Sequence, residues 1–151
     1  FLGLSTALVA GVLQSFSDFV MAGLRRAAPA GGIESMQQLN RTVFRSVFLA
    51  AFLGLVPVNL AFSAYAWLAM DGLPQRLIVL AAAIYIPFVF FVSAFGNVTM
   101  NERLGKMDAT SSEAAAYWQT YHQVWTRWNT VRTLAAIASS GCYLVAAVSI
   151  G

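Results

Sequence analysis

The chain has 151 residues, of which 59% are hydrophobic and only 10% are charged. An ordinary soluble domain carries roughly 25% charged residues, so this composition excludes a typical soluble enzyme and predicts an integral membrane protein. The net charge of +3 comes from basic residues that are spread over the ends of apolar runs, without a basic stripe of interleaved aromatics. We therefore expect membrane lipids as partners and no nucleic acid.

The first two apolar runs are each close to the roughly 20 residues that a helix needs to cross the hydrocarbon. The first covers residues 2–24 and stops at two arginines before the turn AAPAGG; we treat it as a retained span and not as a cleaved signal peptide. The second helix begins near Ile33 as an amphipathic stretch and continues into the apolar run 47–70. Pro57 lies in the middle of that run, where we expect a kink and not a break.

The tight turn DGLP leads into the third run, residues 75–95, which contains Pro87 and continues as a helix beyond the membrane. A fourth helix starts at DATSSE, where Thr110, Ser111 or Ser112 can cap it, and crosses the membrane at 130–150. The sequence thus predicts an all-α fold: one domain over residues 1–151, built as a four-helix membrane bundle with cytoplasmic helix extensions.

The basic residues predict the orientation. The connections between runs one and two and between runs three and four carry four basic residues each, whereas the DGLPQR turn carries only Arg76. By the positive-inside rule both long connections face the cytoplasm and both termini face outward. We expect a bacterial inner-membrane protein.

Three predicted helices carry polar or aromatic side chains at the same level. Gln37, Asn40 and Phe44 share one face of the second helix, and Asn97 and Asn101 share a face beyond the third span. The last helix carries one stripe at spacings of four, three, four and three residues, formed by Trp118, His122, Trp125, Asn129 and Arg132. These groups either bond helices together and anchor the headgroup region, or line a shared site.

Two ionisable residues need separate attention. Asp18 lies within the first span, where an acid costs about 3 kcal/mol on insertion scales, so we predict that it faces the interior and pairs with Arg132, or else with Arg41 or Arg45. His122 is a single histidine without metal-ligand spacing around it, so no metal, haem or other cofactor is expected. A role as proton carrier remains open for it.

Four stretches resemble a known family: GVLQSFSDFVMAGLRR, MQQLNRTVF, NVTMNERL and WTRWNTVRTLAA. In this order they are similar to the anthrone oxygenase-like family of small four-helix membrane proteins. The resemblance implies oxidation of an anthrone, a tricyclic polyketide, to an anthraquinone with molecular oxygen and without metal or flavin. The chain departs from the family pattern at Ala22 and Thr99, where proline is usual, and at Thr130, where histidine is common.

The resemblance also implies residue roles, since the reaction needs a base, donors to an enolate oxygen and a dry aromatic pocket. The catalytic candidates are Asp18 or His122 as base and Arg132 as oxyanion donor. The substrate-binding candidates are Gln37, Asn40, Phe44, Asn97, Asn101, Trp125 and Asn129.

A second interpretation is a non-enzymatic accessory subunit of a larger membrane complex, a homo-oligomer, or a bundle that holds lipid or quinone. The missing histidine at Thr130 and the few acid and base groups favour it. A transporter is a third, weaker interpretation, because four spans show no inverted repeat.

Overall fold

The computed structural model describes residues 1–150, and every element within them is helical. The predicted all-α fold is therefore confirmed. Four helices in this part of the chain are long and apolar enough to cross a membrane: Leu2–Arg26, Val47–Ala69, Gly72–Gly105 and Ser112–Ile150. The predicted spans lie within these helices to within one residue. The helices support an integral membrane protein.

The first long helix contains one irregular turn. α1 (Leu2–Ser15) is followed directly by the π-helical segment η1 (Phe16–Val20) and by α2 (Met21–Arg26). A π-helical turn holds more residues than an α-helical turn, so it changes which side chains face a neighbouring helix. α2 ends where Ala27 becomes extended, and Pro29 then opens the next helix, where its missing N–H leaves no bond unmade.

The prediction of one continuous second helix is wrong, because the amphipathic stretch and the second span are separate helices. α3 (Pro29–Thr42) runs into a 3-10 turn, η2 (Val43–Arg45), and the chain becomes extended at Ser46. The Ser46 hydroxyl accepts a hydrogen bond of 3.1 Å from the Leu49 amide and so caps α4 (Val47–Ala69). A serine that caps a new helix competes with continuation of the old one. α4 passes Pro57 without a break.

The third long helix contains two π-helical segments. It consists of α5 (Gly72–Tyr85), η3 (Ile86–Phe91), η4 (Ser93–Val98) and α6 (Thr99–Gly105). Pro87 lies in the first turn of η3, where it cannot donate the backbone hydrogen bond of a regular helix. Gly72 has a φ of +72°, a left-handed conformation that favours glycine, and turns the chain from α4 into α5.

The fourth long helix is α7 (Ser112–Ile150), which contains 39 residues. At 1.5 Å per residue it is about 58 Å long, roughly twice the thickness of the hydrocarbon core. A large part of α7 therefore lies outside the hydrocarbon. The Ser111 hydroxyl accepts a hydrogen bond of 3.1 Å from the Ala114 amide, which confirms one of the predicted caps.

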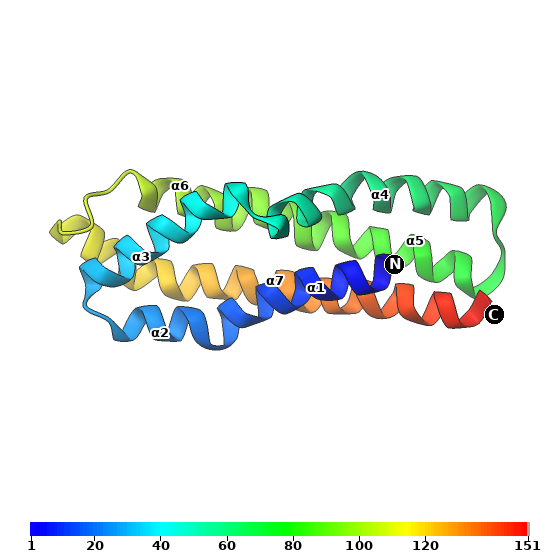
Figure 1. Ribbon diagram of the computed structural model, residues 1–151, viewed down its shortest axis with the longest axis horizontal. Coiled ribbons are helices and arrows are strands. Elements are labelled where there is room, and N and C mark those ends of the chain that lie inside the picture. The colour runs from blue at the N-terminus through cyan, green and yellow to red at the C-terminus, as the bar shows by residue number, and fades with distance from the viewer. Residues whose placement is uncertain (151) are drawn as a thin grey trace.

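α7 is the central helix of the bundle. It packs against both α1 and α5, and α4 packs against α5 and α1. Figure 1 shows that the α2–α3 and α6–α7 connections lie at one end of the elongated bundle, whereas the α4–α5 turn and the C-terminus lie at the other. We call the first of these the polar end. That it faces the cytoplasm stays a prediction.

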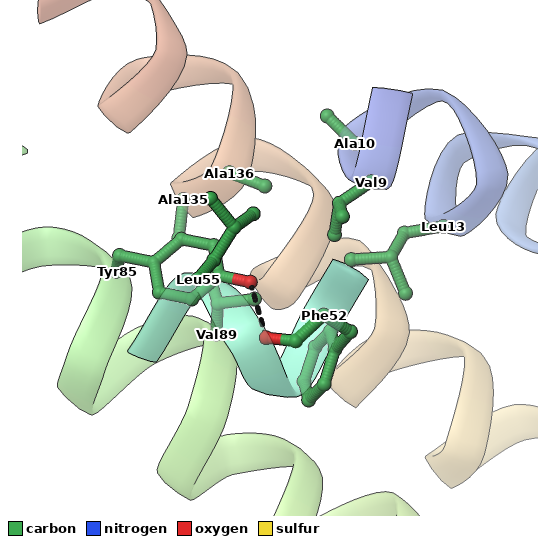
Figure 2. Close-up of a cluster of buried hydrophobic side chains, with 9 residues drawn as sticks. All are labelled: Val9, Ala10, Leu13, Phe52, Leu55, Tyr85, Val89, Ala135 and Ala136. Carbon is green, nitrogen blue, oxygen red and sulfur yellow. Dashed lines mark hydrogen bonds between the residues drawn. The ribbon is translucent and has the colours of Figure 1, made fainter. Parts of the chain in front are cut away.

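The middle of the bundle is an apolar core that draws on all four long helices (Figure 2). Its buried members are Val9, Ala10, Leu13, Phe52, Leu55, Tyr85, Val89, Ala135 and Ala136. The hydroxyl of Tyr85 donates a hydrogen bond of 3.1 Å to the Phe52 carbonyl, so no polar group of this ring is left unpaired. The two alanines allow close approach of α7 to its neighbours. Toward the polar end, α7 next carries the buried polar residues Arg132 and Asn129. A second apolar cluster lies beyond them, formed by Met21, Ile33, Met36, Leu104, Ala114, Trp118, Tyr121 and Trp125.

Candidate functional site

Arg132 on α7 is a buried cation, with 8% of its surface exposed. Its Nη1 donates a hydrogen bond of 3.0 Å to the Ser93 hydroxyl, and its Nη2 donates to the side-chain oxygen of Asn129. The guanidinium carbon lies 5.5 Å from the centre of the Trp125 ring, within the range of cation–π attraction. All of these partners are neutral, whereas a buried arginine is usually paired with an acid.

Asn129 is fully buried and joins Arg132 to the first long helix. Its Nδ2 donates hydrogen bonds of 2.6 Å to the Leu13 carbonyl and 2.7 Å to the Ser17 hydroxyl. Ser17 lies in η1 and Ser93 lies in η4, so two π-helical segments supply the hydroxyls that these α7 side chains bind. π-Helical turns are frequent at functional sites. We call Ser17, Ser93, Asn129 and Arg132 the Arg132 network.

Closer to the polar end, aromatic rings of α7 stack on one another. The ring centroids of Trp118 and Tyr121 are 5.3 Å apart, and those of Tyr121 and Trp125 are 6.3 Å apart. Asn101 accepts two hydrogen bonds of 2.7 Å, from the Tyr121 hydroxyl and from the Trp125 indole N–H. Asn97 donates one of 3.0 Å to the backbone carbonyl of Trp125. Both amides of the third helix therefore face the stripe on α7.

A groove of about 590 Å³ lies between η1, α2 and α7. We call it the His122 groove; it is lined by Ser17, Met21, Ala22, Arg25, His122, Gln123, Thr126, Arg127 and Thr130. His122 is only 7% exposed and packs edge-on against Trp118, with ring centroids 6.2 Å apart. The Ser17 hydroxyl lies 3.1 Å from that of Thr130 and also accepts from Asn129. The inner wall of the groove is thus hydrogen-bonded to the Arg132 network.

The groove and the network contain side chains that can transfer a proton and side chains that can donate hydrogen bonds. The groove offers one imidazole, two guanidinium groups and several hydroxyls, a set suited to proton transfer and to binding an anion. Within residues 1–150, no three His, Cys, Asp or Glu side chains form a group that could hold a metal ion.

Two of the predicted site residues, Asp18 and Phe44, are exposed and lie apart from the His122 groove and from the Arg132 network. Asp18 is exposed, so the prediction that it faces the interior and pairs with Arg132 is wrong. Asp18 lies in the π-helical turn η1, which changes the faces that its side chains occupy, and the neighbouring Ser17 is the residue bonded to α7. Phe44 is 75% exposed and does not line the groove.

The two amides predicted on α3 have different surroundings. The Nε2 of Gln37 donates hydrogen bonds of 2.9 Å to the carbonyls of Leu104 and Met107, so this side chain ties α3 to the end of α6. Asn40 is half-buried, and its Nδ2 has no hydrogen-bond partner among the described residues.

Ser17, Ser93 and Tyr121 were missed from the sequence, and so were the groove residues Arg25 and Arg127. Ser93, Asn97 and Asn101 follow one another at intervals of four residues, so helical periodicity already placed Ser93 beside the two predicted amides. Tyr121 likewise lies four residues before Trp125. Ser17 gave no such signal, because a lone serine in an apolar run is typical of any membrane helix.

Comparison with known proteins identifies a family. A family model described as anthrone oxygenase matches residues 37–142. No curated protein and no solved structure matches the chain. The match contains the amides of α3, η4 and α6 and the polar part of α7, and it confirms the resemblance predicted from the sequence. The η1 and α2 wall of the His122 groove lies outside it.

Proposed function

The chain belongs to the anthrone oxygenase family, and from that premise we propose that it is a membrane oxidoreductase that oxidises a flat aromatic substrate with molecular oxygen. The observation that carries the proposal is the His122 groove, which a nearly buried imidazole and two guanidinium groups line together. Its volume of about 590 Å³ lies in the range of small-molecule sites, roughly 300–1,000 Å³.

The proposed reaction converts the methylene group of an anthrone into a ketone. A base removes one methylene proton, and the resulting enolate carbon reacts with O2 and a proton to give a hydroperoxide. Loss of the second hydrogen as a proton, with cleavage of the O–O bond, gives the ketone and water. The carbon loses two hydrogens and gains one oxygen atom, and the other oxygen atom leaves as water.

His122 is the proposed base, since it lines the groove and Asp18 does not. A neutral imidazole can accept the methylene proton, return it to the peroxide and accept the second one. His122 and Thr130 both line the groove and lie eight residues apart on α7, about two turns. His122 can therefore take the part that the histidine common at position 130 would have in other members.

Arg25 and Arg127 are the proposed groups that stabilise the enolate. Both line the groove and both are exposed. A positive group beside the oxygen that becomes negative lowers the barrier to proton removal. Trp118 packs edge-on against His122 and is only 2% exposed, so it supports the imidazole without lining the groove.

A second candidate function is the binding of a quinone or lipid chain without catalysis. An apolar groove of about 530 Å³ favours it, bordered by Phe91 and Phe95, whose rings stack at 5.9 Å, and by Trp128. Such a groove on the outside of a membrane helix pair fits an isoprenoid or acyl chain, as expected for an accessory subunit.

The test is oxidation of 1,8-dihydroxyanthrone in air by the purified protein in detergent, followed by quinone absorbance and oxygen uptake. The wild type is expected to exceed empty micelles and to consume one O2 per quinone formed. His122→Gln is expected to lower kcat about 10²-fold, whereas the control Asp18→Asn keeps the wild-type rate. If the wild-type protein oxidises the anthrone no faster than empty micelles, and a quinone quenches the fluorescence of Trp128 in a saturable way, this proposal is wrong and the second candidate is favoured.

A further inference from the structure

The charge of Arg132 is not neutralised by any acidic side chain of this protein. The chain contains six acidic residues, and all of them are exposed: Asp18, Glu34, Asp71, Glu102, Asp108 and Glu113. Arg132, in contrast, is only 8% exposed. A guanidinium keeps its proton in proteins, so the free-energy cost of burying it cannot be relieved by loss of the charge. A buried charge without a counter-charge is strongly destabilising.

The hydrogen bonds of Arg132 leave one side of the guanidinium unused. Nη1 and Nη2 each donate to a neutral partner, Ser93 and Asn129, and these two bonds fix the plane of the group. Nε is buried and has no hydrogen-bond partner among the described residues. The edge formed by Nε and an adjacent Nη is the one that binds oxyanions through two parallel hydrogen bonds.

A second unpaired polar atom lies in the same part of the bundle. The side-chain oxygen of Asn97 has no hydrogen-bond partner among residues 1–150, although only 1% of this residue is exposed. Asn97 lies one turn after Ser93 and is bonded to the carbonyl of Trp125, whose ring faces the guanidinium. The unpaired Arg132 Nε is a donor and the unpaired Asn97 oxygen is an acceptor, so a ligand that pairs both needs an ionised oxygen and, besides it, a hydroxyl or N–H group.

We propose that Arg132 anchors a buried anion-binding site in the bundle, and that its ligand carries one ionised oxygen, as a phenolate, an enolate or a carboxylate does. Such a ligand neutralises the guanidinium and accepts from its free Nε–H. The site does not depend on the proposed function, which places its enolate beside Arg25 and Arg127 in the His122 groove.

The site can be tested without substrate or turnover. Thermal unfolding of the purified protein in a neutral detergent is measured against sodium formate and, separately, sodium 4-nitrophenolate, with sodium chloride keeping the ionic strength constant. A bound anion stabilises the folded state in a saturable way, so the unfolding temperature is expected to rise to a plateau. A response to formate alone assigns a carboxylate ligand, and a response to the phenolate alone assigns a phenolate or enolate.

Arg132→Met is expected to weaken anion binding at least about tenfold, because the charged donor is gone. The control is Arg76→Met, which removes an exposed arginine from α5, away from the groove and the network, and should leave the plateau unchanged. Absence of a saturable rise for both anions in the wild type would overturn the site, even if Arg132→Met did not fold. An undiminished rise in Arg132→Met would overturn it as well.

Discussion

Asn129 and Ser17 are 112 residues apart in the chain, yet the Asn129 amide donates a hydrogen bond of 2.7 Å to the Ser17 hydroxyl. The same amide group binds the Leu13 carbonyl, and its oxygen accepts from Arg132. One side chain therefore holds α1, the wall of the His122 groove and the buried cation in a fixed relation.

Asn129→Ala should be among the most destabilising single changes in this bundle. It removes three hydrogen bonds and leaves the Arg132 Nη2 and the Leu13 carbonyl without this partner. Since an unpaired buried polar group costs about 1–3 kcal/mol, the free energy of unfolding should fall by about 2–4 kcal/mol. Unfolding in mixed micelles measures it. The neighbouring Thr130→Ala, at an exposed position, should cost far less, and equal losses would contradict the structure.

Asn101 should be replaceable by an acceptor but not by an apolar residue. Its oxygen accepts from both Tyr121 and Trp125 at 2.7 Å. Asn101→Leu leaves two donors unpaired and should lower the free energy of unfolding by about 1–3 kcal/mol. Asn101→Asp keeps the acceptor and should retain most of the stability. A leucine variant as stable as wild type would show that the two hydrogen bonds contribute little.

Two adjacent glycines of α3 should respond to alanine in opposite ways. A Cβ at Gly32 would lie 2.6 Å from the Leu24 carbonyl oxygen and 3.2 Å from Trp118, whereas a Cβ at Gly31 meets nothing within 4 Å. Gly32→Ala should therefore destabilise by about 1–3 kcal/mol through overpacking. Gly31→Ala should stabilise by up to about 1 kcal/mol, because alanine favours the helix. Thermal unfolding of the pair, measured side by side, decides the point.

The orientation in the membrane can be read from single cysteines. In a Cys142→Ser background, Asp71→Cys in the α4–α5 turn should react with an impermeant maleimide on intact cells. Ser112→Cys at the start of α7 should react only after the membrane is opened, because the polar end carries the basic connections. The reverse labelling pattern would invert the predicted topology.

The sequence predicted the helices well, because long apolar runs leave few alternatives in lipid. It also predicted the buried stripe of α7: Trp118, His122, Trp125, Asn129 and Arg132 are all buried. That success follows from the regular α-helix of residues 112–150, whose period of 3.6 residues places these side chains on one face.

The first and third long helices were harder to interpret for a definite physical reason. Each contains π-helical turns, so side chains after the irregular turn no longer follow a single face. Asp18 and Ser17 both lie in η1, and periodicity alone could not tell which of them turns inward. The cost of a charge in hydrocarbon suggested Asp18, but Asp18 is exposed and Ser17 is the residue that the network uses. The end of α3 at Ser46 depends on one local cap, which a composition-based interpretation overlooks.

α7 has a mechanical consequence. The same unbroken helix passes through the apolar core and forms one wall of the His122 groove, so the two halves cannot tilt independently. Helices tilt to match the thickness of the bilayer. Because α7 is continuous, a tilt of its membrane-spanning half also displaces the half that lines the His122 groove. The width of the groove is then set partly by the length of the surrounding lipid chains, and the rate of any reaction in it should vary across vesicles made from short-chain and long-chain phosphatidylcholine.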